Sequence, residues 1–164
     1  MNKSVKSEQL QLRVSRREKI AIQQAAARAG MDMSAYVLSR ALSVPAARFR
    51  ENAAACAGAA PRYALAELNS LLGGFTTGEL CDAVAEPAPP GLTPFLSNYV
   101  AAMVEQACAK RGIAAPKWTR AVIPLTEPVF GSELKSLRLY LLTHSPPAFR
   151  RRNIFVDSSV GERV

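Results

Sequence analysis

The sequence has little of what most enzymes and metalloproteins need. It contains one histidine, His144, and three widely spaced cysteines, Cys56, Cys81 and Cys108. An odd number of separated cysteines fits neither a disulfide framework nor a zinc site and indicates reduced thiols. The carboxylates form no spaced pair suited to general acid–base catalysis, and there is no glycine-rich phosphate loop. We therefore expect a protein that is not an enzyme and that needs no metal or cofactor.

Long apolar runs are also missing. No run approaches the roughly 18 residues that are typical of a transmembrane helix, and the N-terminal MNKSVKSEQ lacks the apolar core of a signal peptide. The chain nevertheless has the composition of a folded protein, because 49% of its residues are hydrophobic. These features predict a cytoplasmic protein with no membrane partner.

The positive charge is concentrated near one end of the chain. The formal net charge is +8, and residues 1–50 carry 10 Lys and Arg against 3 Asp and Glu. Residues 51–115 carry 3 against 6, and residues 116–164 carry 8 against 4. Such asymmetry favours a polyanionic partner for the first segment, although a solvated basic surface without a partner is the alternative.

The strongest local pattern stands at the start of the chain. Apolar and polar residues alternate there, with Leu10, Leu12 and Val14 set between Gln9, Gln11 and Arg13. This period of two predicts a half-buried β-strand. Ser15 and Glu18 then have the spacing of a capping box, which begins a helix that Gly30 ends. Asp32 is expected to cap a second helix, which Pro45 stops.

One strand and two short helices do not fold alone. A single strand leaves a row of backbone donors and acceptors unpaired, and about 40 residues are too few for an independent core. Both problems are solved when two copies pair their strands antiparallel and pack their helices together. The pattern therefore predicts a homodimer.

This stretch resembles the ribbon-helix-helix family. The resemblance rests on the alternating strand, the capped polar turn, the helix ending in Ala29-Gly30-Met31 and the run Ser34-Ala35-Tyr36-Val37. It is especially similar to ribbon-helix-helix antitoxins that are paired with acetyltransferase toxins. The resemblance implies that a two-stranded ribbon enters the major groove of duplex DNA. The implied DNA-binding residues are Gln9, Gln11, Arg13, Arg16, Arg17, Met33 and Ser34.

The chemistry of these residues agrees with that role. Gln can form paired hydrogen bonds to adenine, and Arg to guanine, at the groove edge. Arg16 and Arg17 would add contacts to the DNA backbone, and the exposed amides near Met33 and Ser34 could hold a phosphate. The alternative is that Gln9, Gln11 and Arg13 are simply the solvated side of a strand.

The remainder is expected to be helical. Residues 46–61 form an Ala-rich linker or a helix extension, and residues 62–164 form a helical partner-binding module after a head at residues 1–45. Within the module, helices are predicted near residues 62–72, 76–84, 93–111 and 133–142. The fold class is thus mainly α, with an intertwined ribbon-helix-helix dimer at the N-terminus.

The C-terminal part resembles a second kind of module. The runs APKWT, EPVF, LKSLRLYLL and SPPAFRRRNIFV are similar to a module that follows DNA-binding heads in bacterial proteins, often encoded beside a nucleotidyltransferase-like toxin. The resemblance covers residues 79–164 and implies that the tail engages a toxin, whereas the head's resemblance implies an acetyltransferase. The expected partner-binding residues are Trp118, Phe149, Arg150, Arg151, Arg152 and Phe155. The arginine triplet suits carboxylates of a partner, phosphates or a solvated turn, and Trp118 suits a core or an interface.

These inferences lead to one functional hypothesis and one alternative. The hypothesis is an antitoxin of a bacterial toxin–antitoxin system, which represses its own promoter as a DNA-bound dimer and neutralises a cognate toxin protein. The alternative is a ribbon-helix-helix transcriptional regulator without a toxin, whose C-terminal domain senses a ligand or oligomerises.

Overall fold

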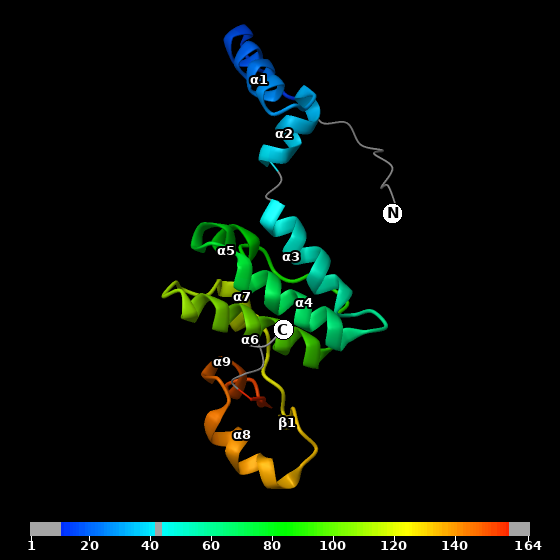
Figure 1. Cartoon of the computed structure of the whole chain (residues 1–164), viewed down its shortest axis with the longest axis vertical. Helices are drawn as coiled ribbons and strands as arrows, with labels where there is room; N and C mark the ends of the chain where they lie inside the picture. Colours follow the sequence, from blue (N-terminus) through cyan, green and yellow to red (C-terminus); the bar gives the residue numbers. More distant parts are fainter. Residues whose placement is uncertain (1–10, 42–43, 158–164) are drawn as a thin grey trace. The chain divides into compact units, whose positions relative to one another are not determined.

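The computed structural model describes residues 11–41 and 44–157, and the chain divides into two compact units, residues 1–42 and 43–164 (Figure 1). The described residues are mainly helical, with two short strands, which confirms the mainly α class. Among the helices of these residues, none is both long and apolar enough to cross a membrane.

The first unit is a helical hairpin of α1 (Arg16–Arg28) and α2 (Met33–Ala41). The capping box predicted at Ser15 is present and begins α1. Gly30 has φ of +65°, a left-handed conformation that glycine adopts without strain. The amide of Met31 donates to the carbonyl of Ala26 at 3.1 Å, which closes the end of the helix. These local predictions are confirmed.

The strand predicted before α1 falls partly outside the described residues. Residues 8–10, including Gln9, lie outside them, and residues 11–15 belong to no helix or strand in the single chain. A strand that pairs only with a second copy would have no partner here. The ribbon therefore stays a prediction.

The second unit holds the remaining elements. Its helices are α3 (Val44–Ala55), α4 (Pro61–Gly74), α5 (Thr77–Ala83), α6 (Pro94–Lys110), α7 (Lys117–Ala121), α8 (Arg138–His144) and α9 (Pro147–Arg150). A short 3₁₀ helix, η1 (Lys135–Leu137), precedes α8, and β1 (Val129–Phe130) pairs in parallel with β2 (Ile154–Phe155). In that pair Val129 lies opposite Ile154.

Helix α6 is the centre of the second unit. Thr93 caps it and Pro94 occupies its first turn, as the sequence predicts, and Gly112 follows its end with φ of +66°. Packing around it are α4, α7 and α9 (Figure 1). Because it is surrounded in this way, α6 buries residues on most of its circumference, including Val100 and Val104, which are fully buried.

The Ala-rich stretch after Pro45 forms helix α3. Phe49, Ala53 and Cys56 are fully buried, and the helix packs against α4 and α5 within the second unit. The helix before Pro45 ends at Ala41, and Pro45 itself lies in the first turn of α3. Proline is tolerated there because the amide it lacks would have no partner within the helix.

The predicted helix at residues 133–142 is present in part, as η1 followed by α8. Leu141 is buried as expected. Leu134 and Leu137 were expected to face inward or sideways, but they are 62% and 40% exposed. Leu134 and Leu137 therefore do not face the core, whereas Leu141 does.

Candidate nucleic-acid interface

The start of α1 is fixed by reciprocal hydrogen bonds. The Ser15 amide donates to Glu18 Oε2 at 2.8 Å, and the Glu18 amide donates to Ser15 Oγ at 3.3 Å. The bond from the backbone of Ser15 lowers the pKa of Glu18, so this carboxylate stays ionised at the positive end of the helix. The cap thus sets the direction in which residues 11–14 enter α1.

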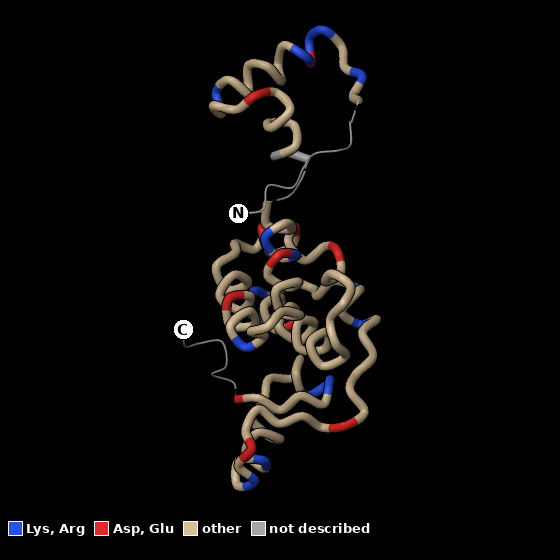
Figure 2. The backbone as a smooth tube through the Cα atoms, turned by 90° about the vertical axis from the view of Figure 1, so that its right-hand side faces the viewer, with Lys and Arg blue, Asp and Glu red and all other residues tan. Residues whose placement is uncertain are grey.

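Exposed cations surround this cap. Arg13, Arg16, Arg17 and Lys19 are all exposed (blue in Figure 2). Positive side chains are unfavourable near the positive end of a helix dipole, and Glu18 offsets only part of that effect. An anionic partner would relieve the remainder. Arg16, Arg17 and Gln11 are therefore accessible for the contacts predicted from the sequence.

The start of α2 presents a second set of predicted contacts. Asp32 caps this helix, because its Oδ1 accepts a hydrogen bond from the Ala35 amide at 2.8 Å. Met33 and Ser34 are exposed in the first turn. A phosphate at this end would lie close to the Asp32 carboxylate, which weakens the predicted phosphate contact.

The two sets of predicted contacts are not adjacent within one chain. Arg16 begins α1, whereas Met33 follows the turn at its far end. A helix of 13 residues is about 20 Å long at 1.5 Å per residue. A single copy therefore does not bring them together.

The first unit has almost no core of its own. Among the described side chains of residues 11–38, Ala26 is the buried one. Several large apolar side chains are exposed: Leu12 at 60%, Val14 at 45%, Ile20 at 46% and Met31 at 48%. Burying apolar surface contributes about 25 cal/mol per Å², and a hairpin that buries one alanine gains little of it. The described side chains of this unit therefore contribute little buried apolar surface of their own.

The residues of the C-terminal part that were predicted to bind a partner differ in their exposure. Phe149, Arg152 and Phe155 are 4%, 4% and 8% exposed, so they are part of the interior of the second unit. Trp118 is half-buried, and its Nε1 donates to the Val84 carbonyl at 2.8 Å. Arg150 and Arg151 are exposed, and of the predicted set they are the ones fully open to a partner.

Arg152 joins several elements instead of facing a partner. Its guanidinium donates to Glu105 Oε1 at 2.7 Å, to Asn98 Oδ1 at 3.1 Å and to the Thr119 carbonyl at 2.6 Å. The Asn98 amide in turn donates to the carbonyls of Pro94 and Ile123, both at 2.9 Å. This network ties α6 and α7 to the turn after α9.

Sequence reasoning missed a second structural arginine. Arg111 Nη2 donates to the carbonyls of Leu72, Gly73 and Phe75 at 2.9, 2.8 and 2.7 Å. It thereby satisfies carbonyls at the end of α4 and places a positive charge at the negative end of that helix. Asn98 carried a signal that could have been used, since it is a polar residue within the apolar sector of α6.

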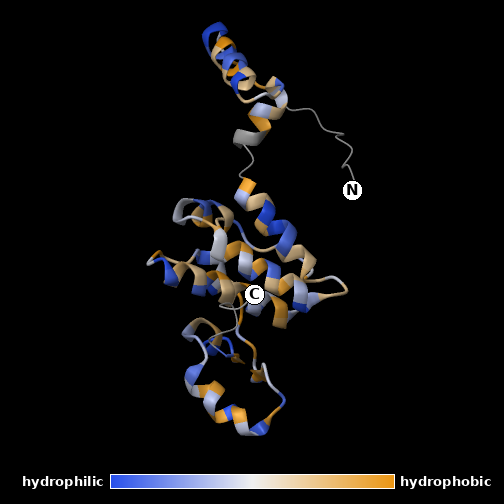
Figure 3. Ribbon diagram, in the orientation of Figure 1, coloured by the Kyte–Doolittle hydropathy of each residue, from blue (hydrophilic) through white to orange (hydrophobic). Residues whose placement is uncertain are grey.

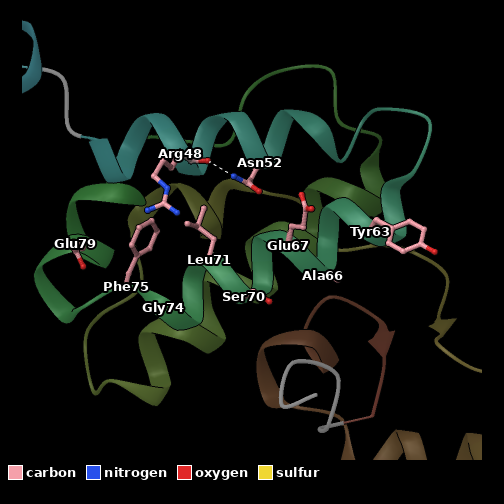
Figure 4. Close-up of a pocket in the computed structure, with 10 residues that line it drawn as sticks. All are labelled: Arg48, Asn52, Tyr63, Ala66, Glu67, Ser70, Leu71, Gly74, Phe75 and Glu79. Atoms are coloured by element: carbon pink, nitrogen blue, oxygen red, sulfur yellow. Dashed lines mark hydrogen bonds between the residues drawn. The ribbon is translucent and has the colours of Figure 1, made fainter. Parts of the chain in front are cut away.

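A pocket of about 660 Å³ with a mixed polar and apolar lining lies among α3, α4 and the start of α5 (Figure 4). Arg48, Asn52 and Glu67 line it, together with the ring of Phe75. Asn52 Nδ2 already donates to the Arg48 carbonyl at 3.0 Å, and Glu79 at the rim caps α5 through Thr76. Because Asn52 and Glu79 already form hydrogen bonds within the chain, we assign no ligand to the pocket.

One comparison with known proteins finds a similarity. The model of the family described as NikA-like, Mobilization protein NikA, matches residues 4–75. The matched region covers residues 4–42 of the first unit together with α3 and α4. Comparison with curated proteins and with solved structures finds no match. The first part of the chain is thus similar to a mobilization protein.

Proposed function

We propose that this chain binds duplex DNA as a homodimer through residues 1–42, in a ribbon-helix-helix arrangement. The main observation is the nearly coreless first unit. Leu12, Val14 and Ile20 are exposed in one copy, and a second copy would bury them while pairing the two strands.

The charge of the first unit supports DNA as the ligand. Arg13, Arg16 and Arg17 are exposed close to the cap of α1, and dimerisation would double their number. Each phosphate neutralised by Lys or Arg releases counterions, so binding would weaken steeply with salt. The similarity to a mobilization protein supports the same role.

The biological setting has two candidates. The match over residues 4–75 favours a part in the mobilization of DNA. The resemblance of residues 79–164 to modules encoded beside toxins favours the antitoxin role, in which the dimer represses its own promoter and the second unit neutralises a toxin. A regulator without a toxin is the further alternative.

A mobility-shift assay with the DNA upstream of the gene tests DNA binding. The double variant Gln11→Ala with Arg13→Ala should abolish the shift, because these side chains are the predicted base contacts. Arg120→Ala, which removes an exposed arginine of the second unit, is the matched control and should leave the shift unchanged. Equal binding by wild type and the double variant would refute the ribbon mechanism.

Co-expression separates the two settings. An antitoxin role requires that the neighbouring gene be toxic alone and harmless together with this chain. A neighbour that is harmless alone would exclude that role and would leave DNA mobilization or regulation.

A further inference from the structure

The C-terminal part of the second unit carries an unusually apolar exposed segment. We call the exposed apolar residues of this segment the α8 surface. They are Leu134, Leu137, Leu139, Tyr140 and Leu142, which are 62, 40, 74, 43 and 42% exposed. They lie along η1 and α8, where Figure 3 shows apolar residues (orange) interspersed with hydrophilic ones (blue). Apolar patches this concentrated mark interaction sites more often than ordinary surface.

The α8 surface continues into a groove. A cavity of about 890 Å³ is lined by residues of α4, α6 and the C-terminal segment, and Leu137 and Tyr140 belong to both the cavity and the surface. Aromatic rings form much of its wall, with Tyr99 packed edge-on against Phe149 at 5.1 Å between ring centroids. The groove is therefore lined by apolar and polar side chains together and shares Leu137 and Tyr140 with the α8 surface.

Basic side chains are in excess at both the α8 surface and the groove. Between residues 131 and 151 the exposed charged residues are Lys135, Arg138, Arg150 and Arg151 against Glu133 alone. Arg138 is held in place over the ring of Phe130, 5.0 Å from its centroid. The groove adds the basic side chains of Arg62, Lys110 and Arg111 against one acidic side chain, Asp157.

We propose that the α8 surface and its groove form a docking site for an acidic, amphipathic segment of a partner protein. Apolar side chains at helical spacing would enter the groove and cover α8, while flanking carboxylates would pair with Arg150 and Arg151. The proposal does not depend on DNA binding by the first unit, and it names the surface through which the second unit would hold a partner.

Other occupants fit less well. A small ligand inside the groove would leave Leu139 and Leu142 exposed, and a flat bilayer would not fill a concave groove. Nucleic acid would meet the cations but would not cover the leucines. A second copy would bring Lys135 and Arg138 against the same cations and would be repelled.

A peptide-binding measurement on the full chain tests the site. The probe is a labelled helical peptide of about 18 residues with leucines at i, i+3, i+4 and i+7 and glutamates on both flanks. Fluorescence anisotropy should give a Kd below about 100 μM. The variant Leu139→Ser with Leu142→Ser should weaken binding at least about tenfold, a change of about 1.4 kcal/mol. Ile123→Ser, which alters an 83% exposed side chain outside the site, should not.

A charge variant supplies a second measurement. Arg150→Glu with Arg151→Glu changes only exposed side chains and should also weaken binding, whereas a peptide with lysines in place of glutamates should not bind. Equal binding of both peptides, or no loss in either double variant, would overturn the proposal. Two further results would also overturn it. The first is a leucine variant that still binds the peptide but no longer binds phosphatidylserine vesicles. The second is a leucine variant that no longer self-associates in sedimentation. DNA binding measured on the same samples tests the proposed function separately.

Discussion

Replacing Arg152 by leucine should remove much of the stability of the second unit. The side chain of Arg152 is 5% exposed, and that of its partner Glu105 is 15% exposed. Breaking a buried ion pair by removing one member costs about 3–5 kcal/mol, because the other member stays desolvated. Loss of the donor to Asn98 and to the Thr119 carbonyl acts in the same direction. Since Glu105 retains some access to water, we expect the lower part of that range, about 3 kcal/mol.

Urea unfolding followed by fluorescence measures this loss within the second unit. The chain has a single tryptophan, Trp118, which lies in that unit and reports on it alone. With a slope of about 2 kcal/mol per M, a loss of about 3 kcal/mol lowers the midpoint by about 1.5 M. Arg151→Leu, at the exposed neighbouring position, should shift the midpoint by no more than about 0.3 M. Equal midpoints for the two variants would refute the role given to Arg152.

Three further predictions follow from the hydrogen bonds. Trp118→Phe removes the donor to the Val84 carbonyl and should destabilise the second unit by about 1–2 kcal/mol, measured by circular dichroism during thermal unfolding. Arg111→Met leaves three carbonyls at the end of α4 without this donor and should lower the free energy of unfolding, measured in urea, by about 2 kcal/mol. An unchanged urea midpoint would contradict the capping role of Arg111. Because the pKa of Glu18 is lowered, its cap is complete above the ordinary glutamate pKa of about 4.3 and is lost as the pH falls through the lowered value. The difference in helix content between wild type and Glu18→Ala should therefore shrink on acidification, and a constant difference would exclude a role of the ionised carboxylate.

Local chemistry explains which parts of the fold the sequence predicts. The capping box predicted at Ser15 and the helices predicted near residues 76–84 and 93–111 are all present. Each depends on residues three positions apart, or on glycine and proline at helix ends, so the signal and the structure lie within one turn.

Burial explains which parts could not be predicted. Arg150, Arg151 and Arg152 are consecutive and chemically identical, yet only Arg152 is buried. Its partners Asn98 and Glu105 stand 54 and 47 residues earlier in the chain, and no local pattern links them. For the same reason Phe149 and Phe155 were predicted to bind a partner, although tertiary packing buries both.

The central claim is that two copies share a β-ribbon, of which one face is buried in the dimer and the other binds DNA. It is tested most directly by comparing two double variants of the same short stretch in sedimentation equilibrium and in the DNA shift assay. Leu12→Asp with Val14→Asp should convert the dimer into a monomer with reduced helix content. Gln11→Ala with Arg13→Ala should leave the dimer intact and abolish DNA binding. A chain that stays dimeric and binds DNA with aspartates at residues 12 and 14 would contradict the account.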